Sequence, residues 1–330
     1  MTVTVFLVSL LGAMALGMPI AFALLVCALA LMFAQGSFDT TILSQKLIEG
    51  ADSYPLLAIP FFIFAGELMN KGGMSRRIVD FALAVVGHVR GGLGLVAVFA
   101  AIVMAAISGS AAADAAALGT LLIPMMRSAG YDVPRSAGLI AAGSIIAPCM
   151  PPSVALIIFG VIANVSIGKL FMATIFPGLL MGASLVIAWI WVVRKDKIVA
   201  LPRKSMREVV AASRQAVWAL IMPFAIVGGM KFGLFTPTEA AVVACAYAFL
   251  VGMFVNRELK WRDLYPLLVT AAKTTSIVVF LIAAALVSAW LITTSAAGWD
   301  WSRSSRRSSW PPFPVPQRPM RPRSAPFSSR

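Results

Sequence analysis

The sequence has few charged residues, a single histidine and three cysteines, and these scarcities exclude whole classes of protein. Charged residues make up 12% of the 330 residues and hydrophobic residues 60%. Soluble globular domains average about 25% charged and about 45–50% apolar residues. A soluble globular domain is therefore excluded.

Catalytic and metal-binding motifs are also missing. The single histidine, His88, is part of no His-Glu-x-x-His motif or Ser-His arrangement, and the Gly-x-Gly-Asp motif of intramembrane aspartyl proteases does not occur. Cys27, Cys149 and Cys245 lie in apolar segments without the spacing of metal ligands, which is typical of small buried hydrophobic residues. We expect no enzyme, no cofactor and no transition-metal site.

What the sequence has instead is a series of long apolar stretches. Stretches of about 18 residues or more are long enough to cross roughly 30 Å of hydrocarbon as a helix. They are continuous rather than alternating with a period of two, which excludes a membrane barrel. These features predict an all-α, multi-pass membrane protein in a lipid bilayer.

Positive charge is concentrated in two places. Residues 194–215 and residues 298–330 hold many of the arginines and lysines behind the formal net charge of +14. Basic residues in short loops mark the cytoplasmic side, so we place residues 194–215 in the cytoplasm and expect no nucleic-acid partner. Residues 298–330 contain seven arginines, seven prolines and eight serines, a composition that predicts disorder.

The stretch ISGSAAADAAALGT places small and polar residues inside an apolar region. Ser108, Gly109 and Ser110 favour a turn, and Asp114 follows in the first turn of the next predicted helix, where the positive helix end favours a carboxylate. Non-helical backbone occurs at membrane depth only where it is buried in protein or lines a wet cavity. We therefore predict a re-entrant helical hairpin over residues of about 93–126.

A second interruption lies at residues 143–153, GSIIAPCMPPS. Pro148, Pro151 and Pro152 prevent a continuous helix and release carbonyl oxygens. Oxygens exposed at broken helices are ligands that Na⁺ accepts, and half-helix ends attract anions. The two interruptions together predict an ion or substrate site.

Other interpretations of single residues stay open. Gly109 and Ala113 have the small-xxx-small spacing that often serves close helix packing rather than a site. Glu67, in AGELMN, is either a hydrogen-bond partner at a helix end or a site residue. Glu239 follows Thr236 at the spacing of a capping box, which predicts helix capping.

Four motifs resemble one family of transporters. They read IPFFIFAGELMNKGG, ISGSAAADAAALGTLLIPMMRSAGYD, APCMPPS and LFTPTEAAVVACAYAFLVG. In these motifs the chain resembles the large membrane subunit of tripartite ATP-independent periplasmic (TRAP) transporters, the DctM-like permeases. The resemblance extends from Met1 to about Ala297.

The resemblance implies a function and an architecture. It implies sodium-driven secondary uptake, across the bacterial inner membrane, of an organic anion such as a dicarboxylate or a sialic acid. It implies two partners: a small DctQ-like membrane subunit and a periplasmic solute-binding protein that selects the substrate. It also implies an elevator-type fold of two inverted repeats, each with a hairpin.

One sodium site of the family is formed by the first hairpin tip and the broken helix that follows. Carried over residue by residue, the sodium ligands implied here are Ser108, Ser110, Gly143, Ile146 and Pro148. The residues assigned to the hairpin and the substrate region are Gly109, Asp114, Pro151 and Pro152. Na⁺ is the only metal ion implied.

The resemblance also predicts the domain organisation. Residues 1–215 are expected to form the first repeat and residues 216–297 the start of the second. The apolar helices with which a family member continues are missing after Gly298, so we expect an incomplete second repeat. Residues 298–330 are then explained as out-of-frame translation of a frameshifted or truncated gene.

Three alternatives to an active TRAP permease remain at this point. One is a truncated fragment that transports nothing. Another is a binding or scaffold subunit without transport of its own. The third is a dicarboxylate/sodium symporter that works without a binding protein, although Ser-Asn-Thr triplets are expected at its hairpin tips and this chain has Ser-Gly-Ser.

Overall fold

The computed structural model describes residues 2–36, 38–194 and 202–296. Over these residues the structure has thirteen α-helices, three short 3-10 or π-helical segments and no strand. The predicted all-α fold is confirmed. Residues 298–330, for which disorder is predicted, lie outside the described residues.

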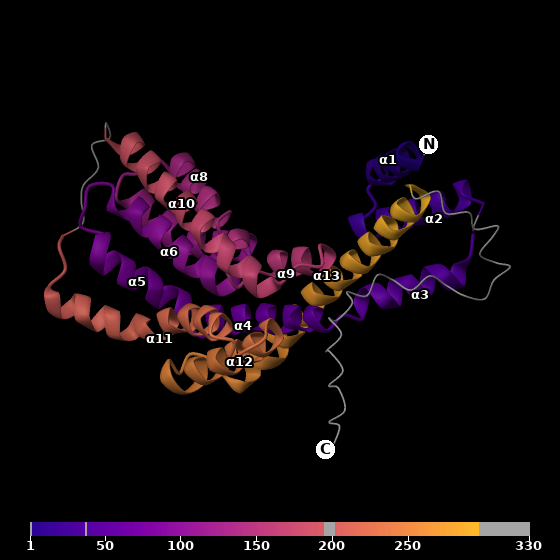
Figure 1. Ribbon diagram of the computed structural model, residues 1–330. Coiled ribbons are helices and arrows are strands. Elements are labelled where there is room, and N and C mark those ends of the chain that lie inside the picture. The colour runs from indigo at the N-terminus through magenta and orange to yellow at the C-terminus, as the bar shows by residue number, and fades with distance from the viewer. Residues whose placement is uncertain (1, 37, 195–201, 297–330) are drawn as a thin grey trace, which may run out of the picture. The chain divides into compact units, whose positions relative to one another are not determined.

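The α-helices follow one another along the chain with short connections (Figure 1). They are α1 (Thr2–Ala15), α2 (Ile20–Ala34), α3 (Thr40–Ala51), α4 (Ala58–Lys71), α5 (Met74–Val86), α6 (Gly92–Ser108), α7 (Ala111–Ser128), α8 (Val133–Ser144), α9 (Val154–Ile162), α10 (Ile167–Val193), α11 (Met206–Lys231), α12 (Pro237–Leu250) and α13 (Trp261–Ala296). The shorter segments are η1 (Tyr54–Leu57), η2 (Ala147–Cys149) and η3 (Val251–Val255).

Helix ends lie where the sequence supplies residues that end or cap helices. The Thr236 hydroxyl accepts a hydrogen bond from the Glu239 N–H at 3.3 Å, and the Glu239 carboxylate accepts one from the Thr236 N–H at 2.7 Å. This reciprocal pair is a capping box at the start of α12, and it confirms the capping role predicted for Glu239. Ser205 and Glu208 form the same arrangement at the start of α11, so residues 206–215 of the basic segment are helical.

Several helices are long and apolar enough to cross a membrane. Among the described residues there are four such helices by length and composition: α10, α11, α12 with η3, and α13. Two bent pairs raise the number to as many as six if each pair is one span. One pair is α3 with η1 and α4, and the other is α8 and η2 with α9, bent by 58° and 42°. The chain is therefore a multi-pass membrane protein.

Contacts divide the chain into two compact units, which we describe separately. The smaller unit contains residues 1–42 and the chain from 287 onward, and the larger unit contains residues 43–286. In the smaller unit, α1 packs against α2, and the Ser288 hydroxyl donates a hydrogen bond of 3.0 Å to the Leu24 carbonyl. The division by contacts differs from the predicted division into repeats, which stays a prediction.

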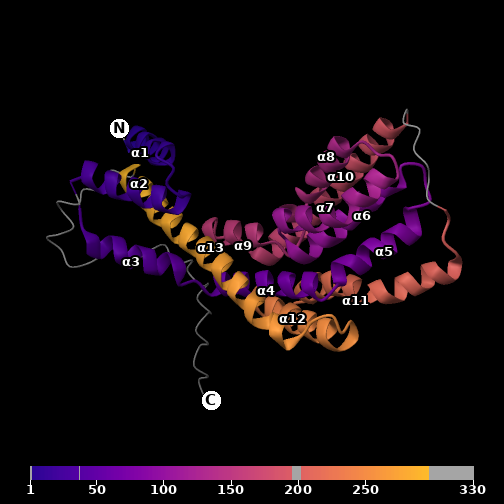
Figure 2. The same cartoon turned by 180° about the vertical axis from the view of Figure 1, so that it is seen from behind.

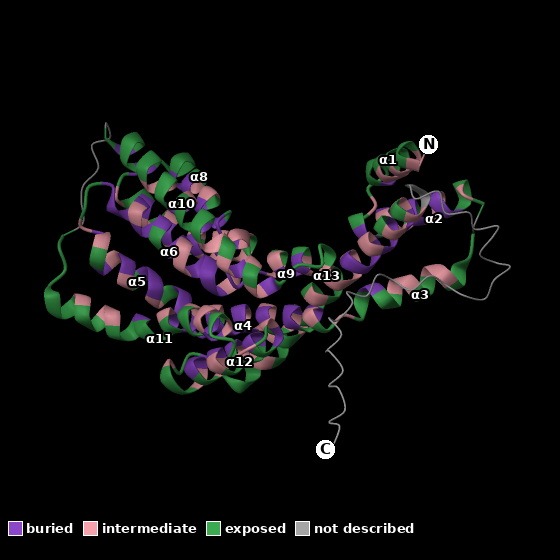
Figure 3. Ribbon diagram, in the orientation of Figure 1, coloured by how far each residue is buried: buried purple, intermediate pink, exposed green. Residues whose placement is uncertain are grey.

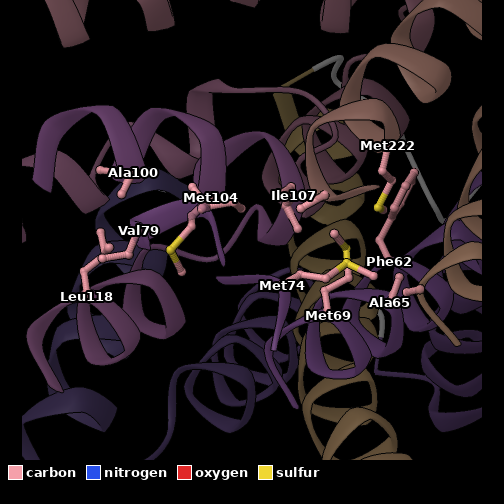
Figure 4. Packing of buried hydrophobic residues seen from close by; sticks show 14 of the residues in the cluster. Phe62, Ala65, Met69, Met74, Val79, Ala100, Met104, Ile107, Leu118 and Met222 are labelled. Atoms are coloured by element: carbon pink, nitrogen blue, oxygen red, sulfur yellow. The ribbon is translucent and has the colours of Figure 1, made fainter. Parts of the chain in front are cut away.

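The larger unit is built around α6. This helix packs against α5, α7, α8 and α10, and most of its residues are buried (Figure 3). Figure 4 shows part of the apolar cluster, with Met104 and Ile107 of α6, Met69 of α4 and Leu118 of α7. By contrast, α10 exposes large apolar side chains such as Phe176 and Trp191, as a helix that faces lipid does. Helix α6 is thus the most buried helix of this unit.

Trp189 of α10 ties that helix to the start of α6. Its indole Nε1–H donates a hydrogen bond of 2.9 Å to the Gly91 carbonyl, and its ring stacks on Tyr131 with ring centroids 6.1 Å apart. A Cβ atom at Gly94 would lie 1.9 Å from the indole. Glycine at position 94 is therefore required for the indole to lie against the α6 backbone.

Polar contacts join two turns that are far apart in the sequence. The Asn256 side chain donates a hydrogen bond of 2.8 Å to the Gly72 carbonyl, and Arg77 forms an ion pair of 2.9 Å with Glu258. These contacts hold the connection between α12 and α13 against the turn between α4 and α5. Since α4 also packs along α12, the two helices and their adjoining turns form one block within the larger unit.

We predict that Trp189→Phe lowers the free energy of unfolding by about 1 kcal/mol, because the buried N–H donor is lost while most of the ring packing stays. The measurement is thermal unfolding of the detergent-purified chain, followed by far-ultraviolet circular dichroism. The expected decrease in midpoint is about 2–4 °C. Trp191→Phe is the matched control, because Trp191 lies on the same helix and is 74% exposed. An equal decrease in both variants would contradict the structural role of Trp189.

Candidate functional site

The predicted hairpin is present, and its turn lies at Ser108, Gly109 and Ser110. Helix α6 ends at Ser108 and α7 begins at Ala111, and the two helices pack against each other (Figure 2). Gly109 has a φ of +59°, a left-handed conformation that glycine adopts without steric cost. The helix is therefore broken where the small polar residues occur.

A chain of hydrogen bonds connects the residues of the turn. The Ser110 backbone N–H donates to the Ser108 hydroxyl oxygen at 3.1 Å, and the Ser108 hydroxyl donates to Asp114 Oδ1 at 2.6 Å. Ser110 is the N-cap of α7, and its side chain accepts a hydrogen bond from the Ala113 N–H at 3.4 Å. The structure thus brings together three predicted site residues, Ser108, Ser110 and Asp114.

Asp114 is a buried carboxylate in mostly apolar surroundings. Its exposed fraction is 0%, and its second carboxylate oxygen, Oδ2, has no hydrogen-bond partner among the described residues. Desolvation of an ionised group buried in protein costs several kcal/mol. Interaction with a helix N-terminus stabilises a carboxylate by only about 0.3–1 kcal/mol. The start of α7 alone does not compensate for the burial of this charge.

The second predicted break is also present. Helix α8 ends at Ser144, η2 follows, and α9 begins only at Val154, with a bend of 42° between the two parts. The Gly143 carbonyl accepts a hydrogen bond of 3.1 Å from the Ile146 N–H, and the Ile146 carbonyl accepts one of 2.9 Å from the Cys149 N–H. A carbonyl oxygen has two lone pairs. The Gly143 carbonyl retains one of them for a further partner, whereas the Ile146 carbonyl also accepts the Met150 N–H at 3.1 Å, so both of its lone pairs are occupied. The prediction of released carbonyls is thus correct only in part at these two residues.

The two breaks pack against each other. A Cβ atom at Gly109 would lie 2.7 Å from the Pro152 carbonyl oxygen and 3.1 Å from the Ser153 Cα, so the tip of the hairpin touches the segment that leads into α9. Ile146 is fully buried in a small cluster with Ala105 and Ala106 of α6. The predicted residues on either side of the contact are therefore held in one packed assembly.

Gly143 lies further along this contact. A Cβ atom there would lie 3.1 Å from Ala101, and Ala101 precedes Ser108 by about two helical turns. Pro148 is part of η2, which packs against both α6 and α7. Pro151 is buried in the same segment and Pro152 contacts the tip. Their assignment as sodium or substrate residues stays a prediction.

Two residues at the tip were not among the predicted site residues. Ser153 is 1% exposed, and its hydroxyl has no hydrogen-bond partner among the described residues. Gly66 of α4 is buried, and a Cβ atom there would lie 3.6 Å from the Ser108 Cα. Both lie in motifs quoted above, Ser153 at the end of APCMPPS and Gly66 in AGELMN. The prolines and Glu67 beside them gave the stronger sequence signals.

The assembly provides oxygen ligands and one negative charge. Hydroxyl, carboxylate and carbonyl oxygens suit hard cations, whereas thiolate and imidazole suit transition metals. In the described part of the chain, no group of three or more His, Cys, Asp or Glu residues is placed to hold a metal ion. The oxygens at the hairpin tip are thus of the kind that hard cations accept.

Comparison with known proteins gives one family over almost the whole chain. Residues 7–303 match the family described as tripartite ATP-independent periplasmic transporter, DctM component. The match covers both breaks, α4 and α12. It bears out the resemblance seen in the four sequence motifs.

Individual relatives carry related names. The chain is 54% identical to the 2,3-diketo-L-gulonate TRAP transporter large permease protein of Escherichia coli over 293 residues, which are 89% of this chain and 69% of that protein. It is 41% identical to the C4-dicarboxylate TRAP transporter large permease protein of Pseudomonas aeruginosa over 78% of this chain and 61% of that protein. It is 39% identical to the sialic acid TRAP transporter large permease protein of Vibrio cholerae over 86% of this chain and 66% of that protein.

We predict that Gly109→Ala destabilises the chain more than Gly130→Ala does. Both glycines have a positive φ, +59° and +82°, so alanine costs about 1–2 kcal/mol at either position. At Gly109 the added methyl group also collides with the backbone of Pro152. At Gly130 no atom lies within 4 Å of the added Cβ atom. The measurement is thermal unfolding of the purified variants.

Gly138→Ala serves as a further control, because that position has no positive φ and no atom within 4 Å of the added carbon. We expect the order of stability Gly138→Ala, then Gly130→Ala, then Gly109→Ala. Equal unfolding midpoints for Gly109→Ala and Gly130→Ala would show that the hairpin tip does not press against the Pro152 segment.

Proposed function

This chain belongs to the DctM component family of tripartite ATP-independent periplasmic transporters, and from that premise we propose that it is the large membrane subunit of a Na⁺-driven importer of an organic anion. The observation that carries the proposal is the polar hairpin tip, packed against a second broken helix inside an apolar core. Broken helices of this kind supply substrate and coupling-ion sites in secondary transporters. The family is one of transporter permeases rather than enzymes.

The substrate class follows from the relatives. Three compounds in their names, 2,3-diketo-L-gulonate, C4-dicarboxylates and sialic acid, carry a carboxylate group, whereas isethionate carries a sulfonate. We propose a carboxylate substrate for this chain, with 2,3-diketo-L-gulonate as the first candidate, because the relative of that name is 54% identical.

The partners follow from the tripartite assembly that the family description names. We propose a small DctQ-like membrane subunit and a periplasmic solute-binding protein as the other two components. One relative of this chain is an isethionate TRAP transporter permease protein, DctMQ, of which the chain matches 43%. That name supports a large and a small subunit working together. An assembly of this kind belongs in the bacterial inner membrane.

The sodium site in this proposal consists of oxygens from both breaks. Ser108 and Ser110 contribute from the hairpin tip, and Gly143, Ile146 and Pro148 contribute from the broken helix. Gly109, Pro151 and Pro152 shape the contact between the two. Because Gly109 lies against Pro152 and Ser153, ion binding across the contact stiffens the hairpin against its neighbour. In this proposal, sodium binding thereby orders the hairpin tip before the organic anion binds next to it.

We predict that uptake of labelled 2,3-diketo-L-gulonate requires Na⁺ in cells that produce the chain with its small subunit and binding protein. Ser110→Leu is expected to lower the rate of uptake by about 100-fold, because it removes a proposed sodium ligand together with the hydroxyl that caps α7. The measurement is initial uptake in NaCl and in KCl at equal ionic strength.

Ser128→Leu is the matched control, because Ser128 is an exposed serine at the other end of α7. Its uptake is expected to equal that of the unaltered chain. C4-dicarboxylate and sialic acid, tested in parallel, identify the substrate within the carboxylate class. Uptake at the same rate in KCl would refute the sodium coupling, and an active Ser110→Leu variant would refute the role of the hairpin tip.

A further inference from the structure

The buried charge of Asp114 has no compensating partner in the described part of the chain. The Ser108 hydroxyl is its single side-chain hydrogen-bond donor at 2.6 Å, Oδ2 is unpaired, and no described lysine, arginine or histidine forms an ion pair with it. Ionisable groups within membrane-embedded segments are costly and pair with an opposite charge or serve an ion pathway. A cation close to this carboxylate is a partner that would offset its burial.

Asp114 also determines how Ser108 presents its oxygen. The Ser108 proton points to Asp114 Oδ1, and one lone pair of Ser108 Oγ accepts the Ser110 N–H at 3.1 Å. The remaining lone pair is the one that can face a cation. Without the carboxylate, the hydroxyl rotates freely and its proton can occupy that direction instead.

We propose that Asp114 is the positioning and charge-balancing residue of the sodium site: it orients the Ser108 hydroxyl and supplies the negative charge that offsets the bound ion. This inference rests on the proposed function. It assigns Asp114 to the ion rather than to the substrate region, and it explains why a carboxylate with 0% exposure lies in an alanine-rich turn. Residues that orient a metal ligand typically raise the affinity about 10–100-fold.

Ser153, which lies in the segment packed against the hairpin tip, supports the assignment of Asp114 to the sodium site. Its hydroxyl is buried and unpaired, and its Cα lies 3.1 Å from the position of a Cβ atom at Gly109. Two buried oxygens without hydrogen-bond partners, Asp114 Oδ2 and Ser153 Oγ, thus belong to the two segments that meet at the tip. Buried polar atoms in native structures are rarely left unpaired, so a polar ligand at this contact would account for both oxygens.

The test measures sodium binding directly on the purified full chain. Thermal unfolding is followed in NaCl and in KCl at equal ionic strength, and the Na⁺ concentration that gives half of the stabilisation is determined. Two substitutions separate the two roles of Asp114. Asp114→Asn keeps a hydrogen-bond acceptor for Ser108 but removes the charge, and Ser108→Ala keeps the charge but removes the oriented hydroxyl.

Each substitution is expected to raise the half-effect concentration of Na⁺ by about tenfold or more. In the double variant, the half-effect concentration of Na⁺ is expected to increase by less than the product of the two single increases, because the two residues act as one unit. Asp114→Glu is expected to recover part of the sodium response. Asp132→Asn, which removes an exposed carboxylate paired with Arg135 on a neighbouring turn, is expected to leave it unchanged.

The outcomes separate this inference from the proposed function. If the unaltered chain is stabilised equally by NaCl and KCl, sodium coupling itself is refuted. If the unaltered chain responds to Na⁺ and Asp114→Asn responds at the same concentration, only the role of Asp114 is refuted. Should Asp114→Asn fail to fold, an unchanged sodium response in Ser108→Ala overturns the proposal in its place.

Discussion

The structure depends on one constraint: backbone groups that lose their helical partners in an apolar surrounding must find others. At the hairpin tip this is achieved within three residues. The Gly109 N–H still reaches the Ala105 carbonyl at 3.2 Å, the Ser110 N–H finds the Ser108 hydroxyl, and the Ser110 side chain caps α7. The two serines thus supply the hydrogen-bond acceptors that the turn requires, and their oxygens retain capacity for a ligand.

The same constraint connects packing with function. Glycines on the neighbours of α6 allow close approach to that helix: Gly143 of α8 lies against Ala101, and Gly182 of α10 lies against Ile102. Small-residue packing and an ion site were alternatives in the sequence. The structure shows the close packing, and the proposed ion site uses the same contact. Close packing buries Asp114 completely, and burial lowers the local dielectric. A carboxylate at position 114 then interacts more strongly with a nearby cation than it would at a surface.

The breaks and caps could be predicted from sequence because their causes are local. Gly109, the prolines of residues 148–152 and the Thr236–Glu239 pair act on their own backbone, so their effect follows from residue type and spacing. The Ser108–Asp114 hydrogen bond crosses a turn whose conformation the sequence does not specify. The burial of Ser153 and the approach of Gly66 to Ser108 depend on helices that meet only in the folded chain. Membership of the family was visible in the motifs, whereas the role proposed for Asp114 required the geometry.

The pairing of α4 with the α12 region has a consequence for how the protein is made. The Asn256 side chain and the Gly72 carbonyl that it contacts are 184 residues apart, as are Thr238 and Tyr54, which are joined by a second hydrogen bond. During synthesis, α4 therefore enters the bilayer long before the helix that covers it emerges from the ribosome. Until then lipid or the insertion machinery must shield one face of α4, and the final assembly of this unit is a late, post-insertion event.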